Sequence, residues 1–338
     1  MILVLLAGWA LRQTTNGAPS LLVYQHEPQG IMGTRSKLVA VVKRDRLRDA
    51  QQGLEAAEAE LRRLEALLST WIEPSQISRF NDAPADQPIA LADELVEVLT
   101  AARELYDQTS GVFDITARPL IELWRRAGNE GLLPSKDELA AARAASRWDD
   151  IRFEGEGVSK SRVSTRVDID GIAKGYAIDR ALLRFRREEA EGGMVEVGGD
   201  LRVFGLGPEE RPWIVAIRSP FEDSPWAEIE LDEGAVCSSG DYARSIEIDG
   251  RRFSHIIDPR TGWPAEEIHS VTVVAPDAAT ADAWATALSI LGVSGFDLLP
   301  ATDDLHAMSV TGGPDDYQVS ATPGFRRLLV WAVFDLSE

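Results

Sequence analysis

The chain has 338 residues, of which 44% are hydrophobic and 27% are charged. These fractions are close to globular averages, so disorder is not indicated. The formal net charge of −20 repels nucleic acid and anionic lipid, so we expect no nucleic-acid partner. Cys237 is the only cysteine, which excludes an internal disulfide and a Cys-rich zinc or iron–sulfur site.

An apolar run opens the chain, from Met1 to Leu11. It is shorter than the roughly 20 residues that span a bilayer. It resembles the apolar region of a signal peptide, although no positive residue precedes it and no lipobox cysteine follows. A first β-strand or a wrongly assigned start codon would also account for it. We expect residues 1–20 to be a signal or anchor segment, residues 21–338 to be one domain, and the protein to be exported or periplasmic, with membrane association left open.

The first half of the chain is mainly helical in its patterning. After a strand over 37–42, leucines at helical spacing predict a helix over 46–69, with Trp71 and a polar loop through Asn81 behind it. A second helix is predicted over 93–109, stopped by Gly111. The segment 111–116 then forms a turn before a short helix over 119–126, and Ser135 opens another helix through a capping box.

The second half is richer in strands. Residues 167–170 have the pattern of a strand end, after which Gly171 opens a helix to about residue 187. Strands are predicted at 195–200, 213–218 and 270–275, and the Asp249-Gly250 turn predicts a hairpin of 245–248 with 252–257. Thr280 is expected to cap a helix that ends near Gly292. Because the helices and strands interleave without a βαβ rhythm, we predict the α+β class.

Asp282 and Thr286 are the first candidate site. They are four residues apart, so they share one helix face. A carboxylate and a hydroxyl one turn apart can hold an oxygen-ligated cation such as Mg²⁺. The alternative is structural, because an acidic residue in a first helical turn is favoured by the helix dipole alone and a threonine can bond back to a carbonyl.

The segment from Asp168 to Tyr176 is the second candidate. Acids end a predicted strand and Gly171 starts a helix, a geometry that presents free N–H groups to a phosphate. Lys174 could reach the same anion. The alternative is an ordinary turn with solvated charges, since the glycine spacing fits neither the Rossmann fingerprint nor the P-loop.

His255 is the third candidate, on a strand that ends in an Asp-Pro turn. It could act as a general base on a substrate hydroxyl. It could also activate Ser238, Ser239 or Cys237 as a covalent nucleophile, or be a structural histidine. Neither serine sits in a Gly-x-Ser-x-Gly elbow, which counts against a hydrolase.

The order of these motifs resembles that of the FAD:protein FMN transferases, the ApbE family. The resemblance covers roughly residues 30–315 and rests on seven motifs in family order. They are Met32-Gly33-Thr34, Gly111 to Thr116, Asp168 to Tyr176 with Asp179, Gly198-Gly199-Asp200, Ser239 to Tyr242, His255 to Gly262, and Ala281 to Leu288.

The resemblance implies an α+β fold of two interleaved lobes, with mixed or antiparallel sheet, flanking helices and a flavin cleft between the lobes. It implies a site for FAD, as substrate, at Met32, Trp71, Val112, Phe113, Asp114, Asp168, Lys174 and Ile256. It implies a Mg²⁺ site at Gly171, Asp282, Ala285 and Thr286, and it makes His255 the candidate base.

The sequence departs from the family pattern at three of its positions. Many members carry Tyr where this chain has Trp71, and Trp keeps a stacking ring but lacks the hydroxyl. Some members carry Asp where this chain has Ala285, so a backbone oxygen would ligate the metal there. Asp170 is often a smaller residue in the family, and an extra carboxylate there could tune metal affinity.

The implied reaction is attack of a threonine or serine hydroxyl on the FMN-side phosphorus of FAD, with AMP leaving. The implied partner is a flavoprotein subunit of a membrane redox complex. The alternatives are an FAD pyrophosphatase that uses water as the nucleophile, and a flavin-binding protein without catalysis.

Overall fold

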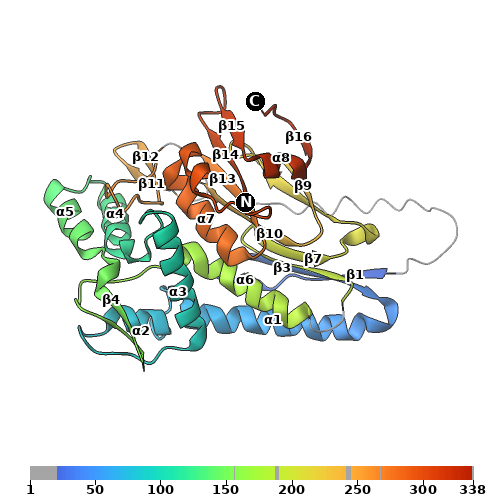
Figure 1. Ribbon diagram of the computed structural model, residues 1–338, viewed down its shortest axis with the longest axis horizontal. Coiled ribbons are helices and arrows are strands. Elements are labelled where there is room, and N and C mark those ends of the chain that lie inside the picture. The colour runs from blue at the N-terminus through green and yellow to red at the C-terminus, as the bar shows by residue number, and fades with distance from the viewer. Residues whose placement is uncertain (1–20, 156, 187–189, 241–244, 267, 337–338) are drawn as a thin grey trace.

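Figure 1 shows a computed structural model of the chain, in which helices cover an extended antiparallel sheet. The structure describes residues 21–155, 157–186, 190–240, 245–266 and 268–336. The signal segment predicted for residues 1–20 lies outside these ranges, as do Asp241 and Tyr242 of the fifth motif. Among the described residues, no helix combines the length and apolar character that crossing a membrane requires.

The helices lie in both halves of the chain. They are α1 (Leu47–Leu68), α2 (Gln76–Asp82), α3 (Asp93–Gln108), α4 (Arg118–Glu130), α5 (Lys136–Ala145), α6 (Asp170–Arg186), α7 (Ala278–Leu291) and α8 (Pro323–Leu328).

The strands are mostly in the second half. They are β1 (Leu21–His26), β2 (Gln29–Ile31), β3 (Thr34–Lys43), β4 (Ile151–Glu154), β5 (Gly157–Lys160), β6 (Gly192–Val197), β7 (Asp200–Gly205), β8 (Trp213–Arg218), β9 (Pro225–Leu231), β10 (Gly234–Gly240), β11 (Ser245–Ile248), β12 (Arg251–Ser254), β13 (Ser270–Ala275), β14 (His306–Thr311), β15 (Gln318–Ala321) and β16 (Leu329–Ala332).

The main sheet has the order β1-β3-β6-β7-β10-β13-β14-β15, with β2 paired to β3. Its neighbours pair antiparallel throughout, for example Ala40 opposite Gly193 in β3 and β6. A smaller sheet has the order β16-β9-β8, and β11–β12 and β4–β5 are separate hairpins. The antiparallel sheets with flanking helices confirm the α+β class.

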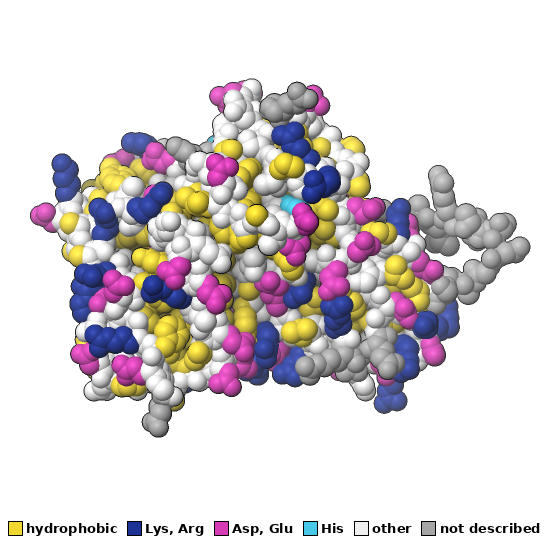
Figure 2. Space-filling view, in the orientation of Figure 1, with side chains coloured by type: hydrophobic (Ala, Val, Ile, Leu, Met, Phe, Trp, Pro, Cys, Tyr) yellow, Lys and Arg dark blue, Asp and Glu magenta, His cyan; other side chains and the backbone are white. Residues whose placement is uncertain are grey.

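Three apolar clusters hold these layers together. The largest lies between the main sheet and α1, α3, α6 and α7, and includes Leu61, Ile178 and Trp284. The second fills the space between the main sheet and the smaller sheet. The third joins α4 and α5 to the β11–β12 hairpin through Trp124. In Figure 1, α2 to α5 gather at one end of the molecule, away from the small sheet. Figure 2 shows acidic and basic side chains interspersed over this face.

Several sequence predictions are confirmed. The leucine-rich helix is α1, which buries Leu54, Leu61, Leu64 and Leu68 on one face. The Ser135 capping box is present at the start of α5. The Asp249-Gly250 turn joins β11 and β12, although β12 ends at Ser254, so His255 follows the strand rather than lying on it.

The polar loop expected up to Asn81 is wrong, because α2 occupies most of it. Ser75 caps this helix by accepting a hydrogen bond from the Ser78 N–H at 3.1 Å. Ile77 and Phe80 are fully buried, so packing stabilises a helix whose polar sequence concealed it.

The strand end expected at 167–170 is also wrong. This segment is extended but pairs with no strand among the described residues. The Asn81 side chain takes the place of a strand neighbour, since its Oδ1 accepts from the Val167 N–H at 2.7 Å and its Nδ2 donates to the Val167 carbonyl at 2.8 Å.

The cap of α7 is Asp277 rather than Thr280. The Asp277 carboxylate accepts from the Thr280 N–H at 2.8 Å, and the helix begins at Ala278. Asp282 therefore lies in the second turn, where the backbone N–H groups are already used within the helix. The dipole explanation for an acidic residue at Asp282 is weakened by this shift.

The crossing of α6 and α7 depends on Gly175. A Cβ at this position would lie 2.0 Å from the Ala278 carbonyl oxygen, so any other side chain would push the helices apart. We expect Gly175→Ala to lower the free energy of unfolding by about 3 kcal/mol, as overpacking of a rigid core does. Urea denaturation measures this change.

Gly155→Ala is the matched control, because a Cβ there meets nothing within 4 Å. Its effect should stay within about 0.5 kcal/mol, as at other open surface positions. Equal destabilisation by the two variants would contradict the close-packing explanation.

Candidate functional site

The start of α6 anchors the candidate site. The Asp168 N–H donates to the Ile115 carbonyl at 2.7 Å, which places the 111–116 turn beside it. The Asp168 carboxylate in turn accepts from the Asp170 N–H at 3.1 Å. Two motifs that are far apart in sequence therefore meet at one helix N-terminus.

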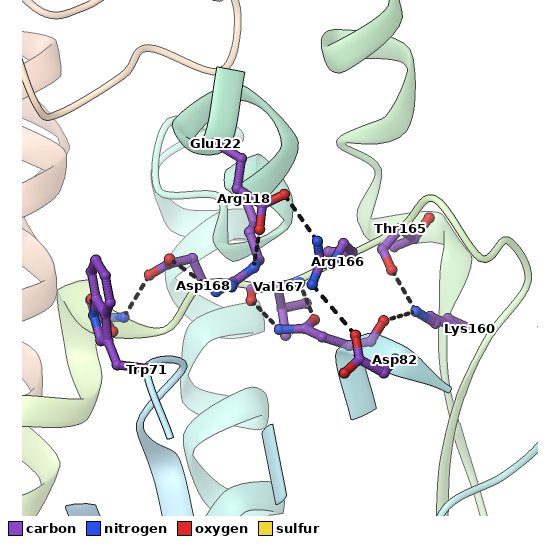
Figure 3. A network of polar contacts seen from close by, with 11 residues as sticks. Trp71, Asp82, Arg118, Glu122, Lys160, Thr165, Arg166, Val167 and Asp168 are labelled. Carbon is purple, nitrogen blue, oxygen red and sulfur yellow. Dashed lines mark hydrogen bonds and ion pairs between the residues drawn. The ribbon is translucent and has the colours of Figure 1, made fainter. Parts of the chain in front are cut away.

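A polar network holds the extended segment that leads into α6, as Figure 3 shows. Buried Lys160 donates to the carbonyls of Asn81, Val163 and Thr165. Burial lowers the pKa of Lys160 from its usual value. This lysine substitutes for strand pairing, because it satisfies carbonyls that would otherwise lack a partner.

The same network reaches Asp168 from α4. Arg118 bonds to Glu122 at 2.8 Å and pairs with Asp168 at 3.5 Å, and Arg166 bonds to the other oxygen of Glu122 at 3.0 Å. Burial, and then the nearby Asp170 carboxylate, raise the pKa of Asp168 to about 7. The site thus contains a carboxyl group that titrates near neutral pH.

Two carboxylates tie α6 and α7 together in opposite directions. Asp282 on α7 accepts from the Gly175 N–H of α6 at 3.0 Å. Asp179 on α6 accepts from the Ala278 and Ala279 N–H groups at the start of α7, at 2.8 and 2.9 Å. The Arg202 guanidinium forms an ion pair with the Asp179 carboxylate at 2.7 Å. The position of Asp282 is therefore fixed by backbone contacts on both helices.

Two of the predicted metal ligands, Gly171 and Thr286, lie side by side at this crossing. A Cβ on Gly171 would lie 3.0 Å from Thr286 Oγ1 and 3.3 Å from the Phe113 ring. The absence of that Cβ leaves the space beside the Thr286 hydroxyl open. Thr286 donates to the Asp282 carbonyl at 3.2 Å, and the Ala285 carbonyl accepts from Ser289 at 2.8 Å.

The donor set suits a hard cation. Within the described ranges, no three His, Cys, Asp or Glu side chains converge as a metal cluster. The predicted set instead combines one carboxylate with hydroxyl and carbonyl oxygens, a mixture that Mg²⁺ accepts. Burial raises the pKa of Asp282 to about 7, Lys174 acts against that rise, and Asp200 adds to it. A cation beside Asp282 would stabilise the charged form of this carboxylate and so offset the effect of its burial.

Lys174 does not lie free at the helix start. Its ammonium forms an ion pair with Asp200, whose other oxygen accepts from the Ser238 N–H at 2.9 Å. The Asp200 and Asp282 charges raise the pKa of Lys174 despite its burial. The lysine predicted to reach an anion is thus already paired with a buried carboxylate.

Trp71 lies just after the end of α1, and Met32 lies in the turn between β2 and β3, which contacts α1. The Trp71 indole donates to Asp170 at 3.4 Å. The Met32 N–H donates to the Glu65 carboxylate of α1 at 2.9 Å, and Met32 has a φ of 49°. This left-handed conformation is uncommon outside glycine and is held by the contact with Glu65.

Three further residues of the predicted flavin site lie in the turn before α4. Val112 and Phe113 are buried. Asp114 accepts from the N–H and the hydroxyl of Thr116, at 2.8 and 2.7 Å. Burial raises the pKa of Asp114 to about 6, against the effect of these hydrogen bonds.

His255 and Ile256 lie on the loop that follows β12. His255 is half-buried, and the Ile256 carbonyl accepts from the Ala265 N–H at 2.9 Å. The loop packs on α4, because Trp124 donates to the Gly262 carbonyl at 2.8 Å. Since α4 also carries Arg118, one helix supports both the His255 loop and Asp168.

Cys237 and Ser238, two of the three residues considered as a covalent nucleophile, are poorly placed for that role. Cys237 is fully buried, and burial raises the pKa of its thiol well above the usual value. The Ser238 hydroxyl is bonded to Thr272 at 2.8 Å. A thiolate, which is the reactive form, is therefore disfavoured.

Sequence reasoning missed several residues that shape the site. Asn81 and Glu65 act only through backbone groups distant in the chain, so no local pattern marks them. Arg118 lies two residues after the 111–116 motif and begins α4, and this closeness in sequence is the signal that could have found it.

Cavities of about 490 and 420 Å³ lie outside the predicted residues. The first is between α4 and α5 and is lined by Glu122, Arg126 and Arg166 among others. The second is between α3 and α7 and is lined by Glu104, Thr280 and Trp284 among others. Neither includes a residue of the predicted flavin or metal site.

Comparison with known proteins identifies the family. The model of the ApbE family matches residues 32–309, which is most of the chain. The chain belongs to the ApbE family. It is 33% identical to the FAD:protein FMN transferase of Vibrio cholerae over 267 residues, covering 78% of this chain and 80% of that one.

Solved structures agree with this assignment. The flavin transferase ApbE of Vibrio cholerae superposes with a TM-score of 0.79 at 29% identity, over 91% of this chain and 100% of that one. The ApbE protein of Thermotoga maritima gives 0.80 at 30% identity, over 91% and 99%. The ApbE-like fold expected from the motif order is confirmed.

The buried Asp114 predicts a pH-dependent stability. Its raised pKa means that the native carboxyl group holds its proton more tightly than the unfolded chain does. Its contribution is therefore present below about pH 4 and is lost as the pH rises through about 6. Between pH 4.5 and pH 7, we expect the free energy of unfolding of Asp114→Asn to rise by about 2 kcal/mol relative to that of the native chain. Urea denaturation at both pH values tests this, and a difference that does not change with pH would contradict it.

Proposed function

We propose that this chain transfers the FMN part of FAD to a threonine or serine hydroxyl of an acceptor protein. Membership of the ApbE family and the name of its Vibrio cholerae relative support the reaction class. The observation that carries the proposal is the meeting of Gly171, Phe113 and Thr286 at the α6–α7 crossing. It gathers residues from three separate motifs around one point.

The reaction forms one bond and breaks one. The acceptor hydroxyl oxygen bonds to the FMN-side phosphorus, the bond from that phosphorus to the bridging oxygen breaks, and AMP leaves with that oxygen. The hydroxyl proton passes to His255, the proposed base, and a positioned base contributes about 10²–10⁴-fold. The remaining work is positioning and neutralisation of charge on the phosphoryl oxygens.

The α6 N-terminus suits the pyrophosphate. The positive end of its dipole favours an anion, although the Asp170 N–H is bonded to Asp168 and the Ile172 and Ala173 N–H groups to the Ile169 carbonyl. Asp282, Thr286 and the carbonyls of Gly171 and Ala285 would hold Mg²⁺ beside it. When bound, this cation supplies positive charge to the phosphate oxygens. Trp71 would stack on an aromatic ring of FAD, and Val112, Phe113 and Asp114 would form the wall of the flavin site.

We also propose a location and a partner. The apolar run in residues 1–20 supports export to the periplasm. The acceptor would then be a flavin-bearing subunit of a membrane redox complex, exposed on that side of the membrane. The proposed transfer needs such a protein hydroxyl within reach of the site.

Mass spectrometry tests the reaction class directly. Candidate acceptors incubated with FAD, Mg²⁺ and this protein should gain the mass of one FMN less one water, on Thr or Ser. Because transfer needs the phosphoryl chemistry, AMP should appear in equal amount, and EDTA should stop both. Rapid FMN and AMP release without acceptor would indicate a pyrophosphatase, and absence of AMP under all conditions would indicate flavin binding alone.

Two variants separate the proposed roles. His255→Ala should slow transfer by about 10²–10⁴-fold and leave FAD affinity unchanged, because a base acts only in the reaction. Asp282→Ala should abolish transfer and keep part of the flavin binding, because it removes the metal ligand and leaves the aromatic contacts. Full transfer by His255→Ala, or equal loss of flavin binding and transfer by Asp282→Ala, would show that these roles are assigned wrongly.

A further inference from the structure

Trp71 is the most exposed of the residues predicted to contact flavin. Its side chain is 65% exposed, and its indole N–H is turned toward Asp170. The Arg125 guanidinium of α4 lies 4.4 Å from the centroid of its ring. This distance is that of a cation–π contact, so Arg125 covers one face of the indole.

Arg125 differs from the other cations around the site. Arg118 is bonded to Glu122 and Asp168, and Lys174 is paired with Asp200. Over the described part of the chain, Arg125 forms no hydrogen bond or ion pair with a carboxylate, and it is exposed. Its N–H donors, five in a guanidinium, remain available to a ligand.

The charge of Arg125 nevertheless acts on the site. It is among the positive groups that lower the pKa of Asp168 against the effect of burial. The guanidinium therefore lies against an exposed aromatic ring and near enough to the carboxylate at the start of α6 for its charge to act there. A protein with a net charge of −20 needs such a local cation to attract a ligand with two phosphates.

One face of the indole cannot hold two partners. A flavin or adenine ring that stacks on the face covered by Arg125 must first displace the guanidinium. Displacement would cost the cation–π contact, which is weak at an exposed site. A guanidinium that then bonds to a phosphate gains a charge-assisted, bidentate contact, which is stronger.

We propose that Arg125 is a substrate-binding residue that exchanges the Trp71 ring for a phosphate of FAD. In the free protein it covers the indole, and in the complex an aromatic ring of FAD takes its place. Lys174, already paired with Asp200, does not supply this contact. The inference rests on the proposed function, since it takes FAD as the substrate.

Binding of three flavins tests the exchange. FAD has two phosphates, FMN has one and riboflavin has none, so only contacts with phosphate distinguish them. With Arg125→Gln, we expect FAD affinity to fall by about tenfold, the usual loss for one hydrogen-bonded charge. Riboflavin affinity should stay unchanged or rise, because its ring no longer competes with a guanidinium. Calorimetric titration of the full chain measures all three.

Arg125→Lys and Arg126→Gln complete the set. Lysine keeps the charge without the bidentate geometry, so FAD affinity should be partly restored. Arg126 is the adjacent residue but pairs with Glu138 and lines the cavity between α4 and α5. Arg126→Gln should therefore bind all three flavins as the native chain does. The FAD affinity of Arg125→Gln should also depend less on salt.

The outcomes separate this inference from the proposed function. Equal weakening of riboflavin and FAD by Arg125→Gln would mean that the arginine only orients Trp71, and would overturn the exchange. Unchanged FAD affinity in that variant, with FMN transfer intact in the native chain, would overturn the Arg125 inference alone. Failure of the native chain to bind FAD would overturn both.

Discussion

The close crossing of α6 and α7 is the contact on which the candidate site depends. Gly175 permits it, because its Cα lies against the Ala278 carbonyl with no room for a side chain. Asp282 and Asp179 then bind the backbone of the opposite helix. Buried hydrogen bonds of this kind are costly to break, since each would leave a charged group without a partner. The spacing of Gly171 and Thr286 follows from this geometry.

Charge is the second constraint on the site. Burial raises the pKa values of Asp168 and Asp282 to about 7. The native fold thus holds these carboxyl groups in surroundings that disfavour their charged form. Strain of this kind is common where function requires it. Lys174 offsets part of the charge but is paired with Asp200. A bound cation, and an arginine from α4, would supply the further positive charge that α6 and α7 themselves lack.

Helix α4 connects parts of the site that the sequence leaves far apart. It pairs with Asp168 through Arg118, covers Trp71 through Arg125, and supports the His255 loop through Trp124. A displacement of this helix would therefore reach His255, the proposed base, and Trp71, the proposed stacking residue, together. The polar network around Lys160 and Asn81 holds the segment of residues 165–168 that leads into α6.

The sequence alone determined the fold class, the amphipathic α1, the β11–β12 hairpin and the family, because periodicity, turn chemistry and motif order are local properties. It also selected Asp282 and Thr286, whose spacing places them on one helix face. Only the tertiary structure decided that Asp277 caps α7, that Asn81 replaces a strand beside Val167, and that Lys174 pairs with Asp200. These outcomes depend on groups that are far apart in the chain, and their energies come from burial and from contacts that exist only after folding.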